Sequence, residues 1–295
     1  MAPGINRLKT WILIAAMGGL FVLVGSIWGR SGMIIALAIA LVFNFSMYWF
    51  SDRIAIATTR SKPVTEQEMP DFYRVVRELA NEQQLPMPRL YVSDMMQPNA
   101  FATGRNPDHA AVAVTRGILQ ILDERELRGV LAHELSHVAN RDILISSVAA
   151  GIGMSITFLA RFAFFFGGDD EGGGNIFALL LAWILAPIAA ALIQMAVTRS
   201  REYQADESGA FLSRDPDALA SALLKLEQAS LKVPAPASVS PAEAHLFIVN
   251  PMNALQARGR GGISSLFRTH PPTEARVERL RAIASELRGE RGPIG

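Results

Sequence analysis

Long apolar runs alternate with segments of mixed polarity along the 295 residues of the chain. Two uncharged runs of 19 residues lie near the N-terminus, and two further apolar runs, the first with a single charge at Arg161, lie between residues 143 and 197. The four runs are Trp11 to Gly29, Gly32 to Phe50, Ile143 to Phe166 and Ile176 to Val197. Because a helix needs about 20 apolar residues to cross a bilayer, the pattern predicts four transmembrane helices in two hairpins.

These hairpins divide the chain into four parts. We expect an N-terminal membrane hairpin at 1–50, a soluble part at 51–142, a second hairpin at 143–197 and a second soluble part at 198–295. Lysine and arginine flank the runs on the soluble side, whereas the loop at 167–175 holds three acidic residues and no basic one. The positive-inside rule therefore predicts that both termini and both soluble parts face the cytoplasm, at a bacterial inner membrane or its equivalent.

The soluble parts show helical periods and short strand-type runs. The period at 70–85 predicts a helix that buries Phe72, Val75, Val76 and Leu79 on one face. Three strand-type runs predict one small antiparallel sheet: Arg89–Ser93, Ala100–Thr103 and Ala110–Thr115. Further helices are expected at 115–122, after an N-cap at Asp123, and at 199–213, 216–231 and 273–287. The expected fold class is mainly α with a small β-sheet, in a polytopic membrane protein.

Composition narrows the classes of protein that remain. Half of the residues are hydrophobic, 19% are charged, and the mean hydropathy is +0.24, which excludes a disordered chain. A net charge of +1 disfavours a nucleic-acid partner. The chain has no cysteine, which excludes disulfides, a cysteine nucleophile and thiolate metal ligands. Any metal must be bound by histidine, aspartate or glutamate, and there are only five histidines.

The candidate chemistry lies in the sequence His133-Glu134-Leu135-Ser136-His137. Two histidines four residues apart share one face of a helix and can bind a single Zn²⁺ ion. Zinc lowers the pKa of a bound water to about 7, and Glu134 beside the first ligand is placed to accept its proton as general base. The motif by itself is moderate evidence, so a third ligand is needed.

The second hairpin supplies that ligand. His137 lies six residues before the third apolar run, and Glu202 lies five residues after the fourth. At 1.5 Å per residue these offsets are about 9 Å and about 7.5 Å, so an antiparallel hairpin returns Glu202 to the height of the histidines. Asp206 lies one helical turn beyond Glu202 and is expected to accept the second imidazole N–H of a ligand histidine.

Four motifs together resemble the HtpX membrane zinc proteases, whose wider kin are the CAAX prenyl endopeptidases. They are the histidine motif at 133–137, the segments Arg201–Asp206 and Pro98–Gly104, and His270–Arg276. The resemblance covers nearly the whole chain. It implies a cytoplasmic zincin-like (gluzincin) catalytic domain that holds Zn²⁺ through His133, His137 and Glu202 and uses Glu134 as catalyst. It also implies action on misfolded or damaged membrane proteins in the cytoplasmic membrane, alongside other membrane quality-control proteases.

The two remaining motifs also have a physical interpretation. Asn99 to Thr103, that is Asn99, Ala100, Phe101, Ala102 and Thr103, can offer a strand edge that pairs with an extended substrate without demanding a sequence. Asn99 would also donate to the substrate backbone. His270 and Arg276 are candidate donors to the oxyanion that forms when water attacks the amide.

Two alternatives to a protease at the membrane surface remain open. An intramembrane-cleaving metalloprotease would carry its metal-binding helix within an apolar run, whereas the segment 123–142 is rich in charge. A catalytically inactive membrane-bound holdase or scaffold would have no need of Glu134, and only an assay separates it from an enzyme. The sequence therefore favours a zinc endopeptidase whose active site lies in the cytoplasm close to the bilayer.

Overall fold

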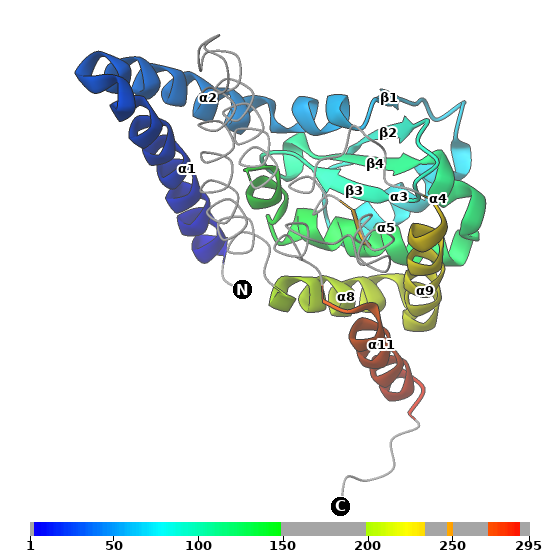
Figure 1. Ribbon diagram of the computed structural model, residues 1–295. Helices are drawn as coiled ribbons and strands as arrows, with labels where there is room; N and C mark the ends of the chain where they lie inside the picture. The colour runs from blue at the N-terminus through cyan, green and yellow to red at the C-terminus, as the bar shows by residue number, and fades with distance from the viewer. Residues whose placement is uncertain (1–2, 149–198, 234–246, 250–270, 290–295) are drawn as a thin grey trace, which may run out of the picture.

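We describe the fold from a computed structural model of the chain, whose described residues are 3–148, 199–233, 247–249 and 271–289 (Figure 1). Its α-helices are α1 Pro3–Gly25, α2 Gly29–Thr58, α3 Pro70–Glu82, α4 Arg116–Ile121, α5 Glu124–Ala139, α8 Arg199–Ser213, α9 Pro216–Lys232 and α11 Thr273–Leu287. The structure also has two 3₁₀ helices, η1 Ser26–Trp28 and η2 Pro107–His109, and four strands, β1 Ser61–Pro63, β2 Arg89–Ser93, β3 Ala100–Thr103 and β4 Ala111–Thr115. Of the predicted third apolar run only residues 143–148 are described, and the whole of the fourth run lies outside the described residues.

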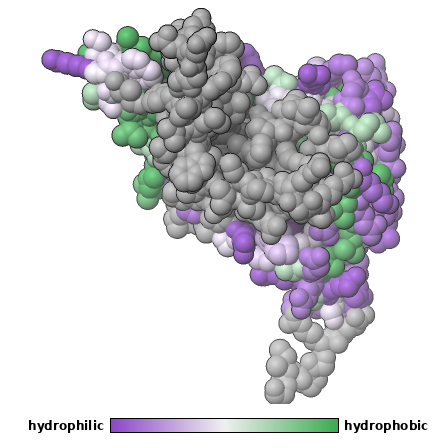
Figure 2. Space-filling model, viewed as in Figure 1, coloured by the Kyte–Doolittle hydropathy of each residue, from purple (hydrophilic) through white to green (hydrophobic). Residues whose placement is uncertain are grey.

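Helices α1 and α2 form the predicted N-terminal hairpin. Within them, Leu8–Gly25 and Gly29–Phe50 are long and apolar enough to cross a membrane. Many large apolar side chains on these helices are exposed, and Figure 2 shows hydrophobic residues on the hairpin at the left of the view. Gly25 and Gly32 let the two helices meet at the tip, because a Cβ on Gly25 would lie 2.6 Å from the Gly32 carbonyl oxygen.

Helix α2 joins the hairpin directly to the soluble part. Its backbone leaves helical geometry at Phe50, with φ −115° and ψ 16°, and the helix then continues to Thr58. Ala55 on this last segment packs against Phe101 of β3 and Ala113 of β4. The predicted boundary at residue 50 therefore coincides with a bend inside one helix, and the helix anchors the hairpin to the sheet.

The sheet is mixed, so the prediction of an antiparallel sheet was wrong. Its order is β1-β2-β4-β3, in which β2 and β4 are parallel and the other two pairs are antiparallel. Strand β4 lies between β2 and β3 because the chain passes from β2 to the far edge before it turns back. All five residues of β4 are buried, as a strand covered on both faces requires. Strand β1 was not expected, since Ser61-Lys62-Pro63 has an edge composition rather than a strand pattern.

The main core lies between the sheet and the helices α3, α5 and α9. The predicted buried face of α3 is confirmed, since Phe72, Val75, Val76 and Leu79 are at most 3% exposed. The predicted N-cap of α5 is also confirmed: Asp123 Oδ1 accepts from the Glu126 amide at 2.9 Å, and Glu126 Oε2 accepts from the Asp123 amide at 3.0 Å. Helix α5 lies between β3 and α8, as Figure 1 shows.

Candidate metal and catalytic site

Helix α5 presents both histidines of the motif toward α8. The His133 and His137 rings lie one helical turn apart, with centroids 4.9 Å from each other and planes at 88°. His133 is 2% exposed and the His137 side chain is 15% exposed. A buried pair of imidazoles with both Nε2 atoms directed to one point is a ready metal-binding face.

Helix α8 brings Glu202 to that point. Its carboxylate oxygens lie 3.9 Å from His133 Nε2 and 3.7 Å from His137 Nε2, and one ligand atom from each of the three residues lies within 4.8 Å of the others. Ligand atoms around a tetrahedral Zn²⁺ ion with bonds of about 2.0–2.2 Å are about 3.4 Å apart. The three side chains therefore fit a metal ion if their ligand atoms move closer together, by a few tenths of an ångström between Glu202 and each histidine.

A glycine on α8 allows the close approach of the two helices. Gly209 lies seven residues after Glu202, and a Cβ at this position would lie 2.8 Å from the His133 amide nitrogen and 2.9 Å from its Cα. No side chain fits there without moving α8 away from α5. The spacing of Glu202 from the histidines thus depends on Gly209.

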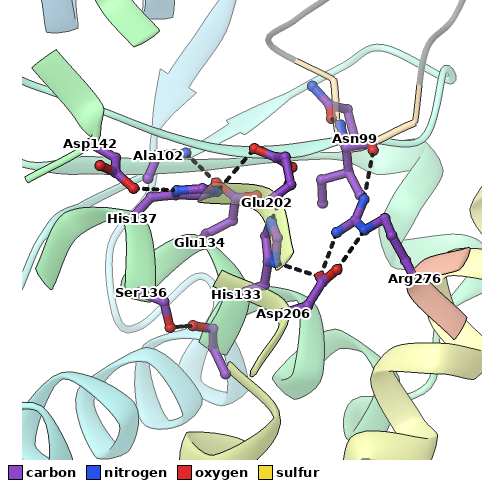
Figure 3. A network of polar contacts seen from close by, with 12 residues as sticks. Asn99, Ala102, His133, Glu134, Ser136, His137, Asp142, Glu202, Asp206 and Arg276 are labelled. Carbon is purple, nitrogen blue, oxygen red and sulfur yellow. Dashed lines mark hydrogen bonds and ion pairs between the residues drawn. The ribbon is translucent and has the colours of Figure 1, made fainter. Parts of the chain in front are cut away.

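The Nδ1 atom of His133 faces the carboxylate that the sequence predicted for this role (Figure 3). Asp206 Oδ1 lies 3.0 Å away, and both oxygens of Asp206 accept from Arg276, at 2.8 Å from Nε and 2.6 Å from Nη2. Burial by itself raises the pKa of Asp206, but the Arg276 guanidinium outweighs it and holds the pKa at about 2. Asp206 is therefore ionised where it faces the His133 ring.

The second histidine has an equivalent partner that sequence reasoning missed. His137 Nδ1 lies 3.2 Å from Asp142 Oδ2, and Asp142 Oδ1 lies 3.1 Å from Arg201 Nε. Burial lowers the pKa of His137, but the contacts with Asp142 and Glu202 raise it above the ordinary value. The available signal was Asp142 itself, an acid five residues after His137 and directly before an apolar run.

Glu134 lies between the histidines and strand β3. Its side chain is buried, and Oε2 accepts a hydrogen bond from the Ala102 amide at 2.9 Å. Burial raises the pKa of Glu134. Because the Ala102 N–H is bonded to Glu134, it points away from β4, toward the edge of the sheet at which β3 lies. Figure 3 shows this carboxylate in the same cluster as His137 and Glu202.

The predicted substrate strand is found at the sheet edge, with one difference at its start. Ala100 to Thr103 form β3, whereas Asn99 precedes the strand and is 1% exposed. The Asn99 side-chain oxygen accepts from the Ile248 amide at 3.1 Å, and Arg276 Nη1 donates to the Ile248 carbonyl at 3.3 Å. Asn99 and Arg276 thus hold one short segment of the chain between them.

The other predicted site residues fall in different places. Arg276 is 1% exposed and directs Nε and Nη2 at Asp206, so its guanidinium supports a carboxylate instead of facing open space. His270 lies outside the described residues. Arg201, a neighbour of Glu202 in sequence, binds Asp142 through both its Nε and its Nη2, the latter donating to the backbone carbonyl at 3.2 Å.

Comparison with known proteins agrees with this arrangement. The family profile described as peptidase family M48 matches residues 66–284. A protease HtpX homolog of Ralstonia pickettii (strain 12J) is 52% identical over 283 residues, which is 95% of this chain and 97% of that protein. Protease HtpX homologs of Ralstonia nicotianae and Burkholderia thailandensis are 53% and 52% identical over the same shares of both chains.

A solved structure is also similar. The crystal structure of S. mikatae Ste24p is 19% identical, aligns with 93% of this chain and 65% of that one, and gives a TM-score of 0.49. The family profile covers the motif on α5 and the glutamate on α8 as well as strands β2, β3 and β4. The chain belongs to peptidase family M48.

Proposed function

We propose that this metalloprotease uses zinc to cleave extended segments of damaged or misfolded membrane proteins at the cytoplasmic face of the membrane. The observation that carries the proposal is the convergence of His133, His137 and Glu202 beside Glu134 and the edge of β3. The chain's membership of peptidase family M48 makes it a hydrolase of peptide bonds, and its similarity to HtpX proteases supports a place at the membrane.

The donor set favours zinc among the metals a peptidase can use. Two imidazoles and one carboxylate are the ligands of catalytic zinc sites of the His₂Glu type, which keep a fourth position open. When bound here, zinc would lower the pKa of a water molecule and polarise the substrate carbonyl. His133, His137 and Glu202 would hold the ion.

Glu134 is assigned as the general base. Glu134 directly follows His133 in the sequence and is buried beside both histidines. Its carboxylate can accept the proton of the attacking water and return it to the leaving amine. The Ala102 amide holds one of its oxygens and so limits the directions the carboxylate can take. The same contact links the base to the strand on which we expect the substrate to lie.

Strand β3 is assigned to substrate binding. It is the last strand of the sheet, so one edge carries backbone groups that no other described strand pairs with. An extended peptide can pair with that edge through its main chain, which tolerates many sequences. Such tolerance suits an enzyme that removes unfolded segments, and Asn99, Ala100, Phe101, Ala102 and Thr103 remain the proposed binding residues.

Two carboxylate–arginine pairs are assigned a positioning role. Asp206 with Arg276 would orient His133, and Asp142 with Arg201 would orient His137. Because Arg276 donates two hydrogen bonds to Asp206, we assign it to positioning Asp206 and not to donation to the oxyanion. His270 stays the predicted oxyanion donor.

The membrane arrangement is part of the same proposal. The apolar run at 143–197 is proposed as a second hairpin, which gives four spans in all, with termini and active site in the cytoplasm of a bacterial cell. The surface of this membrane would supply the substrates, and other quality-control proteases would share them.

Metal removal tests the proposed function. Purified protein in detergent should contain about one zinc per chain, cleave an unfolded protein such as casein, lose this activity with a chelator and regain it with added Zn²⁺. A holdase would bind casein without cleaving it under all of these conditions. An intramembrane protease would cleave only substrates with apolar spans and leave casein intact.

A further inference from the structure

A second candidate site lies about the bend in α2, away from the metal ligands. It is a cavity of about 450 Å³, and its wall includes Trp49, Phe50, Arg53, Arg89, Arg105 and His109. These residues come from three places in the sequence: the end of the apolar part of α2, the first residue of β2, and the connection between β3 and β4. We call this cavity the bend pocket.

The bend pocket lies at the end of a candidate membrane span. The apolar stretch Gly29–Phe50 ends where the backbone departs from helical geometry, and the next residues, Ser51-Asp52-Arg53, are polar. Tryptophan is enriched at the boundary between lipid tails and water, where its ring is half buried and its N–H is wet. Trp49 and the arginines next to it therefore mark the level of the lipid headgroups.

The arginines in the pocket stack on its aromatic rings. The guanidinium carbon of Arg53 lies 5.5 Å from the centre of the Phe50 ring, and that of Arg105 lies 4.8 Å from the centre of the Trp49 ring. A guanidinium stacked on a ring keeps its N–H groups free at its edge. Within the described part of the chain neither arginine forms an ion pair, whereas Arg89 is paired with Asp52.

We propose that the bend pocket binds the phosphate of an anionic phospholipid headgroup. Arg53 and Arg105 supply two cations with N–H donors that match phosphate oxygens, and the exposed rings of Phe45, Trp49 and Phe50 adjoin the lipid tails. The proposal requires that α2 crosses a membrane, and it does not depend on the peptidase chemistry. A soluble phosphate could bind the same two arginines, but it has no apolar tail to contact the aromatic rings.

The site would hold the sheet at a fixed height on the bilayer. Arg105 lies two residues after Thr103, the last residue of β3, and Arg53 lies on the part of α2 that packs on β3. A headgroup that contacts both arginines therefore ties the proposed substrate strand to the membrane surface. Lipid binding there would place the active site within reach of segments that emerge from the bilayer.

The experiment measures lipid binding by the full chain in detergent micelles. Native mass spectrometry and thermal unfolding are recorded with added phosphatidylglycerol, with phosphatidylcholine, and with glycerol 3-phosphate in place of lipid. We expect retention of phosphatidylglycerol and a rise in the unfolding temperature with this lipid alone. The double variant Arg53→Gln with Arg105→Gln should bind phosphatidylglycerol at least about tenfold more weakly. Each basic residue near an anionic lipid surface contributes a factor of about five to the affinity.

A charge-matched control separates the pocket from general attraction to anionic lipid. Arg60→Gln with Arg281→Gln removes two exposed arginines outside the pocket and should bind the lipid as the unmodified chain does. Equal weakening in both double variants, or none in the pocket variant, would overturn the proposal. If glycerol 3-phosphate stabilises the protein as much as the lipid does, the ligand is a soluble phosphate and the lipid proposal is wrong. Casein cleavage by the pocket variant in detergent should be unchanged, which keeps this test separate from that of the proposed function.

Discussion

Each imidazole on α5 is held by a carboxylate that is itself held by an arginine. His133 faces Asp206 and Arg276, and His137 faces Asp142, which Arg201 binds. A buried carboxylate is stable as an anion only when it is paired, so the arginines keep both aspartates charged. We proposed that these charged partners fix the orientation of each ring, with Nε2 toward the proposed metal position.

The ligand and the orienting residue should respond differently to mutation. Glu202→Gln removes a proposed direct ligand and should abolish tight zinc binding, because two histidines leave a catalytic site one ligand short. Asp206→Asn keeps the shape of the side chain and should weaken zinc binding by about 10–100-fold. Zinc titration of the metal-free variants measures both. Equal affinities for the two variants would mean that Glu202 is not a ligand.

Gly209 should be sensitive to a single added methyl group. In Gly209→Ala the new Cβ meets the His133 backbone, so α8 must shift and the unfolding free energy should fall by about 1–3 kcal/mol. The shift should also weaken zinc binding, because it moves Glu202. Ser208→Ala, on the neighbouring residue, serves as control and should have little effect on thermal unfolding. If Gly209→Ala unfolds at the same temperature as the control, α8 lies further from α5 at His133 than the structure shows.

Sequence reasoning selected His133, His137 and Glu202, which the structure brings together, from the motif and from their separations from the apolar runs, but it did not predict all the residues around them. Asp206 was found because it lies one turn from Glu202 on the same helix. Asp142 was missed because it lies beyond the end of α5, where the chain leaves the helix and the helical period no longer predicts direction. The contact of Arg201 with Asp142 could not be predicted, because it arises from the packing of α8 on α5.

At the scale of elements, helix bounds were predicted more accurately than strand pairing. The range of α8 and that of α11 agree with the structure, and α3 ends three residues earlier than expected. Periodicity and capping are local, so the sequence of one helix contains the information for its bounds. Strand direction depends on which strands meet, and short runs separated by turns do not encode the insertion of β4 between β2 and β3.

The start of α5 is tied to α9 through one buried acid. Glu126 caps the helix through the Asp123 amide, and its oxygens accept from Ser221 Oγ and Lys225 Nζ, each at 2.7 Å. Glu126→Ala should lower the unfolding temperature at pH 7 by roughly 3–10 °C, because the cap and both α9 contacts are lost. Glu124→Ala, on an exposed acid in the same turn, should change it much less. Similar losses in the two variants would contradict this role for Glu126.

The same residue predicts a dependence of stability on pH. Burial raises the pKa of Glu126, but the hydrogen bonds from Lys225, Ser221 and the Asp123 amide outweigh it and hold the pKa below the ordinary value. A lowered pKa gives stability that is complete above the unfolded value, about 4.3, and is lost as the pH falls through the folded value. The difference in unfolding temperature between the unmodified chain and Glu126→Gln should therefore shrink below about pH 4. A difference that grows on acidification would reverse the assigned sign.

At the scale of the whole molecule, the absence of cysteine allows a direct test of topology. Ser31 lies at the tip of the α1–α2 hairpin and Asn81 near the end of α3, and both are exposed. In intact spheroplasts an impermeant maleimide should label Ser31→Cys, whereas Asn81→Cys should react only after the membrane is permeabilised. The opposite pattern would place the active site outside the cytoplasm and invert the proposed orientation.

The two helices that carry the site flank a proposed membrane hairpin, so the catalytic part and the membrane part cannot be separated along the chain. Helix α2 packs on the sheet, and α5 and α8 lead toward the run at 143–197. The proposed active site is therefore assembled from segments on both sides of residues 143–197. We therefore expect the proposed catalysis at the membrane surface to require the whole chain and not one excisable part.

The central claim is that Glu134 acts as general base in a zinc site, and one comparison tests it most directly. Glu134→Gln keeps the size of the side chain and the three proposed ligands but cannot accept the proton of the attacking water. Zinc content and casein cleavage should be measured on the same purified sample of the variant and of the unmodified chain. The account predicts equal zinc in both and a loss of cleavage of more than about a hundredfold in the variant. Cleavage by zinc-loaded Glu134→Gln within tenfold of the unmodified chain would contradict it.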